Sequence, residues 1–187
     1  MQLKKTVIPS VREPKFLTSA CKTTSPIVLL SNSNIGNLKS QVEYVHKNNK
    51  QAFAHLELID GFSPDVKGIK LLKNMYSLDG VFTTNIQAGS IAKNIGLTVV
   101  YRFFLIDSRS LKRTANILTK NNFDAIEILP AYSALQEFEH LKQIGGSQEL
   151  IVGGFVKDSK LMEKIFEVEI SGITTSTTDL WQFRKER

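Results

Sequence analysis

Two short segments in the last quarter of the sequence have residue types suited to binding an anion such as a phosphate group. Gly153 and Gly154 are adjacent, and glycines let an anion approach backbone N–H groups closely because they have no side chain. The second segment supplies hydroxyl donors from three successive residues, Thr174, Thr175 and Ser176. Together the two segments predict a phosphate-binding site. The alternative is that the glycines only form a turn.

Four charged residues lie in or next to apolar runs, where they could orient a polar ligand or one another: Arg12, Glu57, Arg102 and Glu127. Arg102 and Glu127 interrupt their runs, and an unpaired charge buried there would be costly. Each of the two therefore needs a partner of opposite charge or a ligand. A buried ion pair that only holds two strands together is the alternative to a ligand site.

The elements that must position these residues are eight apolar, β-branched segments that recur at a nearly even interval. Each is followed by polar or turn residues and then by a stretch with helical spacing, which indicates repeated βα units. We expect strands at residues 6–11, 27–31, 51–59, 80–84, 98–106, 124–130, 149–154 and 171–176. We expect helices at residues 13–23, 34–48, 64–76, 86–94, 108–121, 133–144, 159–168 and 178–187.

Strands joined by helical crossovers must be parallel, and about seven to eight of them predict an α/β fold, a compact (β/α) barrel of the TIM type. The chain is short for this fold, so some helices must be abbreviated. We expect the largest economy after residues 27–31, because residues 32–36 make a weak helix start. An open, flavodoxin-like sheet is the alternative. Sites in such barrels lie at the carboxyl ends of the strands, where the residues above fall.

Composition limits the class of protein. With 187 residues, 42% hydrophobic and 22% charged, the sequence predicts a globular chain with one core, and we expect a single domain over residues 1–187. No apolar run approaches the roughly 20 residues of a membrane helix, and the N-terminus lacks the apolar region of a secretion signal. The single cysteine, Cys21, forms no intramolecular disulfide or zinc cluster. We therefore expect a cytoplasmic protein without a membrane span, metal or cofactor.

The net charge of +6, from 24 Lys and Arg against 18 Asp and Glu, is concentrated in the first half of the chain. Such an excess indicates a polyanionic partner such as RNA. Six lysines on expected helices or next to them could face RNA phosphates: Lys39, Lys47, Lys50, Lys67, Lys70 and Lys73. The alternative is that these lysines only solvate the outer face of their helices.

Histidines and phenylalanines give weaker signals. His55 alternates with Ala54 and Leu56 on an expected strand, which favours a hydrogen-bonded core histidine over a functional base. Phenylalanines such as Phe104 and Phe155 are expected to pack in the core rather than to serve as stacking surfaces.

The order and spacing of several motifs resemble the family of bacterial glycerol uptake operon antiterminator regulatory proteins. The motifs occupy residues 8–12, 55–61, 80–84, 102–108, 127–130, 153–155 and 174–176, and the last is followed by Leu180-Trp181. The chain departs from the family pattern at three places. Glu57 stands where Asp is typical, Ala131 stands where Gly is common, and residues 83–85 read Thr-Thr-Asn instead of Ser-Thr-Arg or Ser-Thr-Lys.

This resemblance implies a non-enzymatic sensor of sn-glycerol 3-phosphate. When liganded, such proteins bind the leader mRNA of glycerol-utilisation operons and let polymerase read past a terminator. The glycine and hydroxyl segments would hold the phosphate, and Arg12, Glu57, Arg102 and Glu127 would orient the glycerol part or one another. Ligand binding would order βα loops or the surface of a homo-oligomer that presents basic residues to RNA.

The alternative from another class is a small barrel enzyme acting on a phosphorylated polyol or sugar, with Glu57 and Glu127 as acid and base. The sequence offers this chemistry little support, since it has no clear strand-end lysine for a Schiff base and no histidine pair for phosphodiester cleavage. A third alternative, a structural or protein-interaction barrel, would bind no small ligand.

Overall fold

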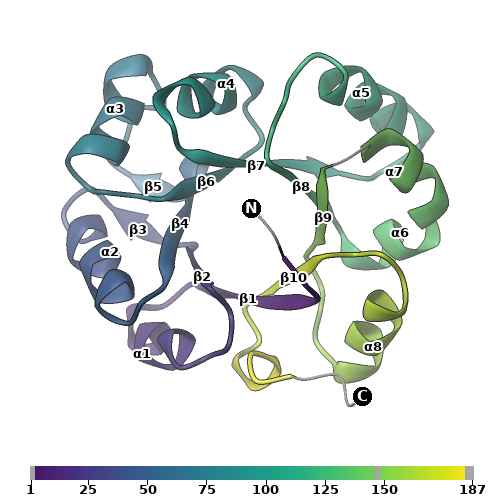
Figure 1. The fold of residues 1–187 in the computed structure, drawn as a ribbon, viewed down its shortest axis with the longest axis horizontal. Coiled ribbons are helices and arrows are strands. Elements are labelled where there is room, and N and C mark those ends of the chain that lie inside the picture. Colours follow the sequence, from purple (N-terminus) through teal and green to yellow (C-terminus); the bar gives the residue numbers. More distant parts are fainter. Residues whose placement is uncertain (1–2, 146–147, 184–187) are drawn as a thin grey trace.

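The computed structural model describes residues 3–145 and 148–183 and shows a closed barrel of parallel strands surrounded by helices (Figure 1). The barrel strands are β1 (Thr6–Val11), β2 (Ile27–Leu30), β4 (Gln51–His55), β6 (Gly80–Thr83), β7 (Thr98–Phe104), β8 (Ala125–Leu129), β9 (Glu149–Val152) and β10 (Gly172–Thr175). Strand β1 pairs with both β2 and β10, which closes the sheet. The predicted eight-stranded α/β barrel is confirmed, and the open, flavodoxin-like alternative is wrong.

Helices cover the outside of this barrel. They are α1 (Leu17–Cys21), α2 (Leu38–Lys47), α3 (Val66–Asn74), α4 (Ile86–Ile95), α5 (Ser108–Leu118), α6 (Ala131–Gln136), α7 (Phe138–Gly145) and α8 (Ser159–Glu167). Three single 3-10 turns are η1 (Pro14–Phe16), η2 (Leu56–Leu58) and η3 (Thr178–Leu180). Two further short strands pair with each other and do not belong to the barrel sheet: β3 (Ser33–Asn34) and β5 (Ile59–Asp60).

The abbreviated helices are confirmed, but their expected place is wrong. The crossover after β2 contains a ten-residue helix, α2, whereas α1 has five residues. The polar stretch before α2 forms a turn in which the Asn34 side chain accepts hydrogen bonds from the backbone of Gly36 and Asn37, so it leads into the helix. The helix expected over residues 178–187 is only the 3-10 turn η3 within the described part, and residues 184–187 lie outside it.

The interior of the barrel is built by the two-residue alternation of its strands. Successive side chains on a strand point to opposite faces, so every second residue faces the barrel axis. One interior layer is apolar and includes Ile8, Phe53, Val100, Ala125 and Ile151. The outward-facing residues pack against the helices in the larger core, which includes Val28, Val81, Ile126 and Ile173.

The next interior layer toward the carboxyl ends of the strands is polar. Two residues beyond Ile8, Phe53, Val100 and Ala125, the strands place Ser10, His55, Arg102 and Glu127. The same strands therefore form a dry floor and a polar layer above it, at the end of the barrel where binding sites lie in this fold. Within residues 3–145 and 148–183, no helix is long and apolar enough to cross a membrane.

Candidate functional site

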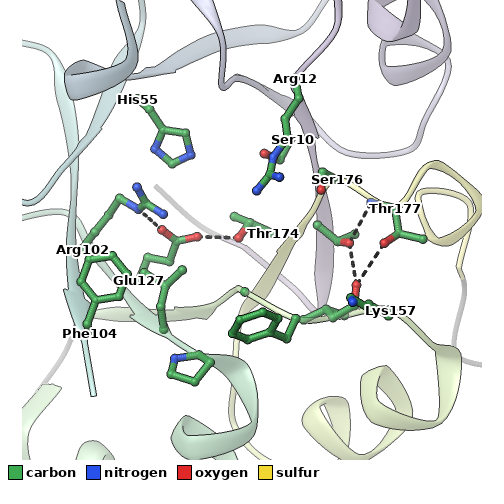
Figure 2. A pocket seen from close by; sticks show the side chains of 16 residues that line it. Ser10, Arg12, His55, Arg102, Phe104, Glu127, Lys157, Thr174, Ser176 and Thr177 are labelled. Atoms are coloured by element: carbon green, nitrogen blue, oxygen red, sulfur yellow. Dashed lines mark hydrogen bonds and ion pairs between the residues drawn. The ribbon is translucent and has the colours of Figure 1, made fainter. Parts of the chain in front are cut away.

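A cavity of about 560 Å3 opens at the carboxyl ends of the barrel strands. Its walls come from β1, β4, β7 and β8 on one side and from the segments after β9 and β10 on the other. Figure 2 shows Arg12, His55, Arg102 and Glu127 directed toward this shared space. The volume falls in the range typical of small-molecule sites.

A buried ion pair forms the base of the cavity. Glu127 on β8 is only 1% exposed, and one of its carboxylate oxygens pairs with the Arg102 Nε on the neighbouring strand β7. Arg102 and Glu127 are direct register partners, which explains why both strands carry a charge at this level. The second carboxylate oxygen accepts a hydrogen bond from the Thr174 hydroxyl on β10 (Figure 2). The network therefore ties three strands together.

Gly153 makes room for this network. A Cβ atom at position 153 would lie 2.2 Å from the Thr174 Oγ1 and 2.7 Å from the Glu127 Oε1. The Gly153 N–H donates to the Ile128 carbonyl oxygen and is thereby occupied. Gly153 also lies outside the cavity lining. The sequence predicted that Gly153 lets a phosphate approach closely, whereas in the structure the groups close to Gly153 are Glu127 and Thr174.

His55 lies at the carboxyl end of β4 and lines the cavity. The residue as a whole is only 5% exposed. Its Nδ1 is buried and has no hydrogen-bond partner among the described residues. Burial lowers the pKa of His55 well below its ordinary value, and the positive charges of Arg102 and Arg12 lower it further. The expected hydrogen-bonded core histidine is therefore wrong at Nδ1: His55 is buried, and this atom lacks a partner among the described residues. A buried polar atom of this kind calls for a partner.

Two of the positively charged residues that line the cavity are arginines. Arg102 uses its Nε for Glu127, and no described residue accepts a hydrogen bond from its terminal nitrogens. Arg12, just after β1, has no ion-pair partner among the described residues, and its guanidinium extends toward the cavity in Figure 2. Guanidinium groups bind phosphate and hydroxyl oxygens through several N–H donors. The cavity thus offers unused donors next to the unpaired His55 Nδ1.

The segments after β9 and β10 form the opposite wall. Gly154 has a φ of +75°, a left-handed conformation that glycine adopts without strain. The backbone N–H groups of Gly154 and Ser176 have no acceptor among the described residues, and the Ser176 hydroxyl is also unpaired there. Lys157 adds a cation to this wall. Free N–H groups beside a hydroxyl and an ammonium group suit an anion.

Thr175 and Thr177 hold the two segments together. The Thr175 hydroxyl donates to the Val156 carbonyl oxygen at 2.9 Å, and the Thr177 hydroxyl donates to the same oxygen at 3.2 Å (Figure 2). The Trp181 indole donates to the Thr175 carbonyl oxygen at 2.8 Å. Of the three predicted hydroxyl residues, Thr174 and Thr175 therefore have structural partners, and Ser176 has a free hydroxyl.

Glu57 does not join the other predicted residues in the cavity. Strand β4 ends at His55, and residues 56–58 form the turn η2 instead of continuing the expected strand. The two-residue alternation is therefore lost, and the Glu57 carboxylate accepts hydrogen bonds from the Thr83 hydroxyl and, at 2.9 Å, from the Thr84 N–H. The structure therefore places Glu57 outside the cavity lining, because the backbone changes conformation one residue earlier.

Of the six lysines predicted to face RNA, two donate hydrogen bonds to backbone carbonyl oxygens of this chain. Lys50 is half-buried at the amino end of β4, where its ammonium group donates to the Thr23 and Ser25 carbonyl oxygens. Lys73 donates to the Gly96 carbonyl oxygen at 3.1 Å. The remaining four are exposed on α2 and α3: Lys39, Lys47, Lys67 and Lys70. Lys50 thus has a structural role, and the others stay a prediction.

Several residues of the cavity were not predicted as site residues. Ser10, His55, Phe104, Phe155 and Lys157 all line it. Phe104 and Phe155 are 53% and 78% exposed, so their expected packing in the core is wrong. The sequence signal for Ser10 and His55 is their alternation with the apolar floor residues Ile8 and Phe53. No such local signal marks Lys157, which reaches the cavity from a loop. Within the described residues, no group of three or more His, Cys, Asp or Glu side chains could hold a metal ion.

The fold and this site define a small TIM-type barrel with a cationic, phosphate-compatible cavity at its mouth. The family described as glycerol-3-phosphate responsive antiterminator matches the chain over residues 7–181, and the chain belongs to that family. The family name denotes a regulator rather than an enzyme.

Three relatives are similar over nearly their whole length. A glycerol uptake operon antiterminator regulatory protein from Listeria monocytogenes has a TM-score of 0.86 at 24% identity and covers 94% of each chain. A related protein from Thermotoga maritima has a TM-score of 0.84 at 24% identity, covering 96% of this chain and 98% of its own. The uncharacterized protein YgcP of Escherichia coli is 26% identical over 96% of this chain and 93% of its own.

Proposed function

We propose that this chain binds sn-glycerol 3-phosphate in the cavity at the barrel mouth and, in the liganded state, binds a leader mRNA and prevents premature termination of transcription. Membership of the family supports the ligand and the antitermination. The observation that carries the binding site is the set of unsatisfied donors and acceptors around one cavity, above all the buried His55 Nδ1.

The phosphate would lie against the segments after β9 and β10. There it would accept hydrogen bonds from the free N–H groups of Gly154 and Ser176 and from the Ser176 hydroxyl, with Lys157 as counter-ion. Arg12 extends from the other side and can contact the phosphate or the neighbouring hydroxyl. These contacts favour a dianion over a neutral polyol.

The glycerol part would lie between the phosphate and the polar layer. The neutral His55 can accept a hydrogen bond from a ligand hydroxyl through Nδ1, and the terminal nitrogens of Arg102 can donate to hydroxyl oxygens. Glu127 acts on the ligand indirectly, because it fixes the direction of the Arg102 side chain. An analogue without hydroxyls would leave these buried groups unpaired, which is the usual source of strong discrimination.

Coupling to RNA requires that the ligand bind the RNA-competent state more tightly than the other state. The ligand would bridge segments from both halves of the chain, since Arg12 and His55 come from the first half and Gly154 and Ser176 from the second. Filling the cavity would therefore order the loops at the barrel mouth. Because leader mRNA is the partner, we place the protein in the cytoplasm.

Transcription in vitro tests this proposal. The template carries the leader and terminator of a glycerol-utilisation operon from the same genome, and the reaction contains RNA polymerase and the purified protein. We expect read-through to rise when sn-glycerol 3-phosphate is added, and not with glycerol or inorganic phosphate alone. Unchanged read-through at a ligand concentration that saturates the protein would reject antitermination, and absence of ligand binding would reject the sensor altogether.

The enzyme alternative predicts turnover of a phosphorylated polyol. Glu127 is the one acidic residue among the described side chains that line the cavity, and Arg102 and Thr174 engage both of its oxygens. This arrangement favours binding over acid–base chemistry. The enzyme alternative would be favoured over the sensor if incubation with sn-glycerol 3-phosphate gave a product and Glu127→Gln abolished its formation.

A further inference from the structure

A second cavity of about 540 Å3 lies beside the ligand cavity and has a different character. One wall is the segment just after β7 and the first turns of α5, with Leu105, Ile106 and Lys112. The other wall is formed by α6, the start of α7 and their junction, with Tyr132, Gln136 and His140. We refer to this cavity, lined by these residues, as the α5–α6 groove.

The α5–α6 groove combines exposed apolar side chains with unpaired positive charge. Ile106 is 83% exposed and Tyr132 is 62% exposed, so both leave a large apolar area in water. Helix α5 contains Arg109, Lys112 and Arg113 and no acidic residue. Residues three and four apart are neighbours on a helix, so Arg109 lies beside both Lys112 and Arg113, and of the three only Lys112 lines the groove. None of the three forms an ion pair within residues 3–145 and 148–183.

Two acidic residues also line the groove, but both have local partners. The Asp107 carboxylate accepts the Ser110 N–H at 2.7 Å as the N-cap of α5. The Glu137 carboxylate contacts the His140 Nδ1 at 2.8 Å. The cations of α5 have no such local partner. Both carboxylates keep their negative charge, and Lys112 is the one Lys or Arg among the described lining residues, so the positive edge is the exposed face of α5 outside the groove. A partner that fits would place anionic groups along this edge of α5 and a flat, apolar group in the groove.

We infer that the α5–α6 groove binds single-stranded RNA, with an unstacked base against Tyr132 and Ile106 and the adjoining phosphates along Arg109, Lys112 and Arg113. Proteins read single-stranded RNA by stacking splayed bases on aromatic rings and by hydrogen bonds to the base edges. Gln136 and Ser133 offer such hydrogen-bonding groups on the same wall. This inference rests on the proposed antiterminator function and specifies which surface carries it.

The groove is also placed to respond to the ligand. Arg102 and Phe104 line the ligand cavity, and the next residues along the chain, Leu105 and Ile106, line the groove. The same holds after β8, where Leu129 and Pro130 line the ligand cavity and Tyr132 lines the groove. The Leu105 N–H donates to the Leu129 carbonyl oxygen at 2.7 Å, which ties these two segments together. Two consecutive strand ends thus serve both sites.

The test compares two basic surfaces of the same protein. RNA is first selected from a random-sequence single-stranded pool by the unaltered protein in saturating sn-glycerol 3-phosphate, and its Kd is then measured for each variant. We expect the double substitution Arg109→Ala/Lys112→Ala to weaken binding at least about tenfold. It should also reduce the slope of log K against log salt concentration by about 1.4, the value for two lost single-strand phosphate contacts. The double substitution Lys67→Ala/Lys70→Ala tests the rival basic surface on α3, and the matched control Lys160→Ala/Lys164→Ala on α8 should retain the original affinity.

A second pair of variants tests the base contact. Tyr132→Ala should weaken RNA binding about tenfold, and Tyr132→Phe should restore it, because the ring supplies the stacking surface. All variants should keep the thermal shift produced by sn-glycerol 3-phosphate, which confirms that they fold and bind ligand.

The outcomes separate this inference from the proposed function. If the unaltered protein selects no RNA in the presence of ligand, the proposed function fails and the inference fails with it. If it selects RNA and the α3 pair loses affinity while the groove variants do not, only the inference is overturned. A groove substitution that turns a dimer into a monomer in size-exclusion chromatography without changing RNA affinity would show a protein interface and would also overturn it.

Discussion

The amino and carboxyl ends of the barrel both place charged side chains between strands, and they differ in how these groups are paired. At the amino end, the Asp79 carboxylate accepts the Ala52 N–H at 2.7 Å and contacts the His46 Nε2 at 2.8 Å. The Asp124 carboxylate accepts the Val99 N–H at 2.9 Å and pairs with Lys93. Each aspartate links a neighbouring strand to the end of a helix.

At the carboxyl end, the polar groups are only partly paired. Glu127 is satisfied by Arg102 and Thr174, but the Nδ1 of His55, the terminal nitrogens of Arg102 and the N–H groups of Gly154 and Ser176 have no partner among the described residues. Buried polar groups are nearly always hydrogen-bonded in proteins, and of these unpaired groups the His55 Nδ1 is the buried side-chain atom, so it favours a ligand at this end. The difference between the two ends therefore supports the proposed binding site.

The largest effect is expected at the buried ion pair between Glu127 and Arg102. Glu127→Ala removes the partner of the buried Arg102 and should lower the free energy of unfolding by about 3–5 kcal/mol, the usual cost of breaking a buried ion pair. Denaturant unfolding measures this loss. The double substitution Glu127→Met/Arg102→Met is the control and should recover most of the stability. A loss below about 1 kcal/mol in the single variant would mean that the pair is not structural.

Arg12 should show the opposite behaviour. It has no ion-pair partner in the described structure, so Arg12→Ala should leave the melting temperature nearly unchanged. We expect the affinity for sn-glycerol 3-phosphate to fall roughly 10- to 100-fold, since a hydrogen bond to a charged group contributes about 1.5–3 kcal/mol. Titration calorimetry checks this, with Lys39→Ala as the control for overall charge. Unchanged affinity would place Arg12 outside the site.

Asp124 at the amino end should affect stability alone. Asp124→Ala leaves the Val99 N–H without its acceptor, which should lower the free energy of unfolding by about 1–2 kcal/mol. The Kd for sn-glycerol 3-phosphate should stay within about twofold, because the residue lies at the other end of the barrel. A large change in Kd would contradict the division of roles between the two ends.

The smallest effect concerns pH. His55 in the folded protein has a pKa well below its value in the unfolded chain, chiefly because of burial and then because of Arg102 and Arg12. Below about pH 6.5 the unfolded chain binds a proton that the folded protein does not, so stability should fall as the pH falls from 6.5 toward 5. His55→Gln should make this part of the pH dependence shallower. An equally steep dependence in the variant would assign it to other groups.

Much of the fold could be predicted from the sequence because its signals are local. Apolar, β-branched runs and helical spacing place the eight barrel strands, and the charged pair Arg102 and Glu127 could be predicted to need a partner. In the structure the two residues bind each other, and the terminal nitrogens of Arg102 have no acceptor among the described residues, so a role toward a ligand stays a prediction.

The remaining errors arise from contacts that no local pattern encodes. Glu57 leaves the site because the chain turns at residue 56, and a two-residue alternation cannot show where a strand ends. Whether the His55 Nδ1 finds a hydrogen-bond partner depends on which side chains β1 and β7 place beside it. The α5–α6 groove exists because two helices from consecutive βα units flank it. Chain segments far apart in sequence decide these features, so they become visible only in the folded structure.

Thermal unfolding with a panel of ligands tests the central claim, that the open network at the barrel mouth is completed by sn-glycerol 3-phosphate. At about 100 times its Kd the ligand should add roughly 2.7 kcal/mol of stability and raise the melting temperature by about 5–10 °C. The shift should be smaller with glycerol or inorganic phosphate and should be lost in Gly154→Asp, which places a carboxylate where the phosphate would bind. No shift, or a larger shift with another phosphorylated compound, would contradict the account.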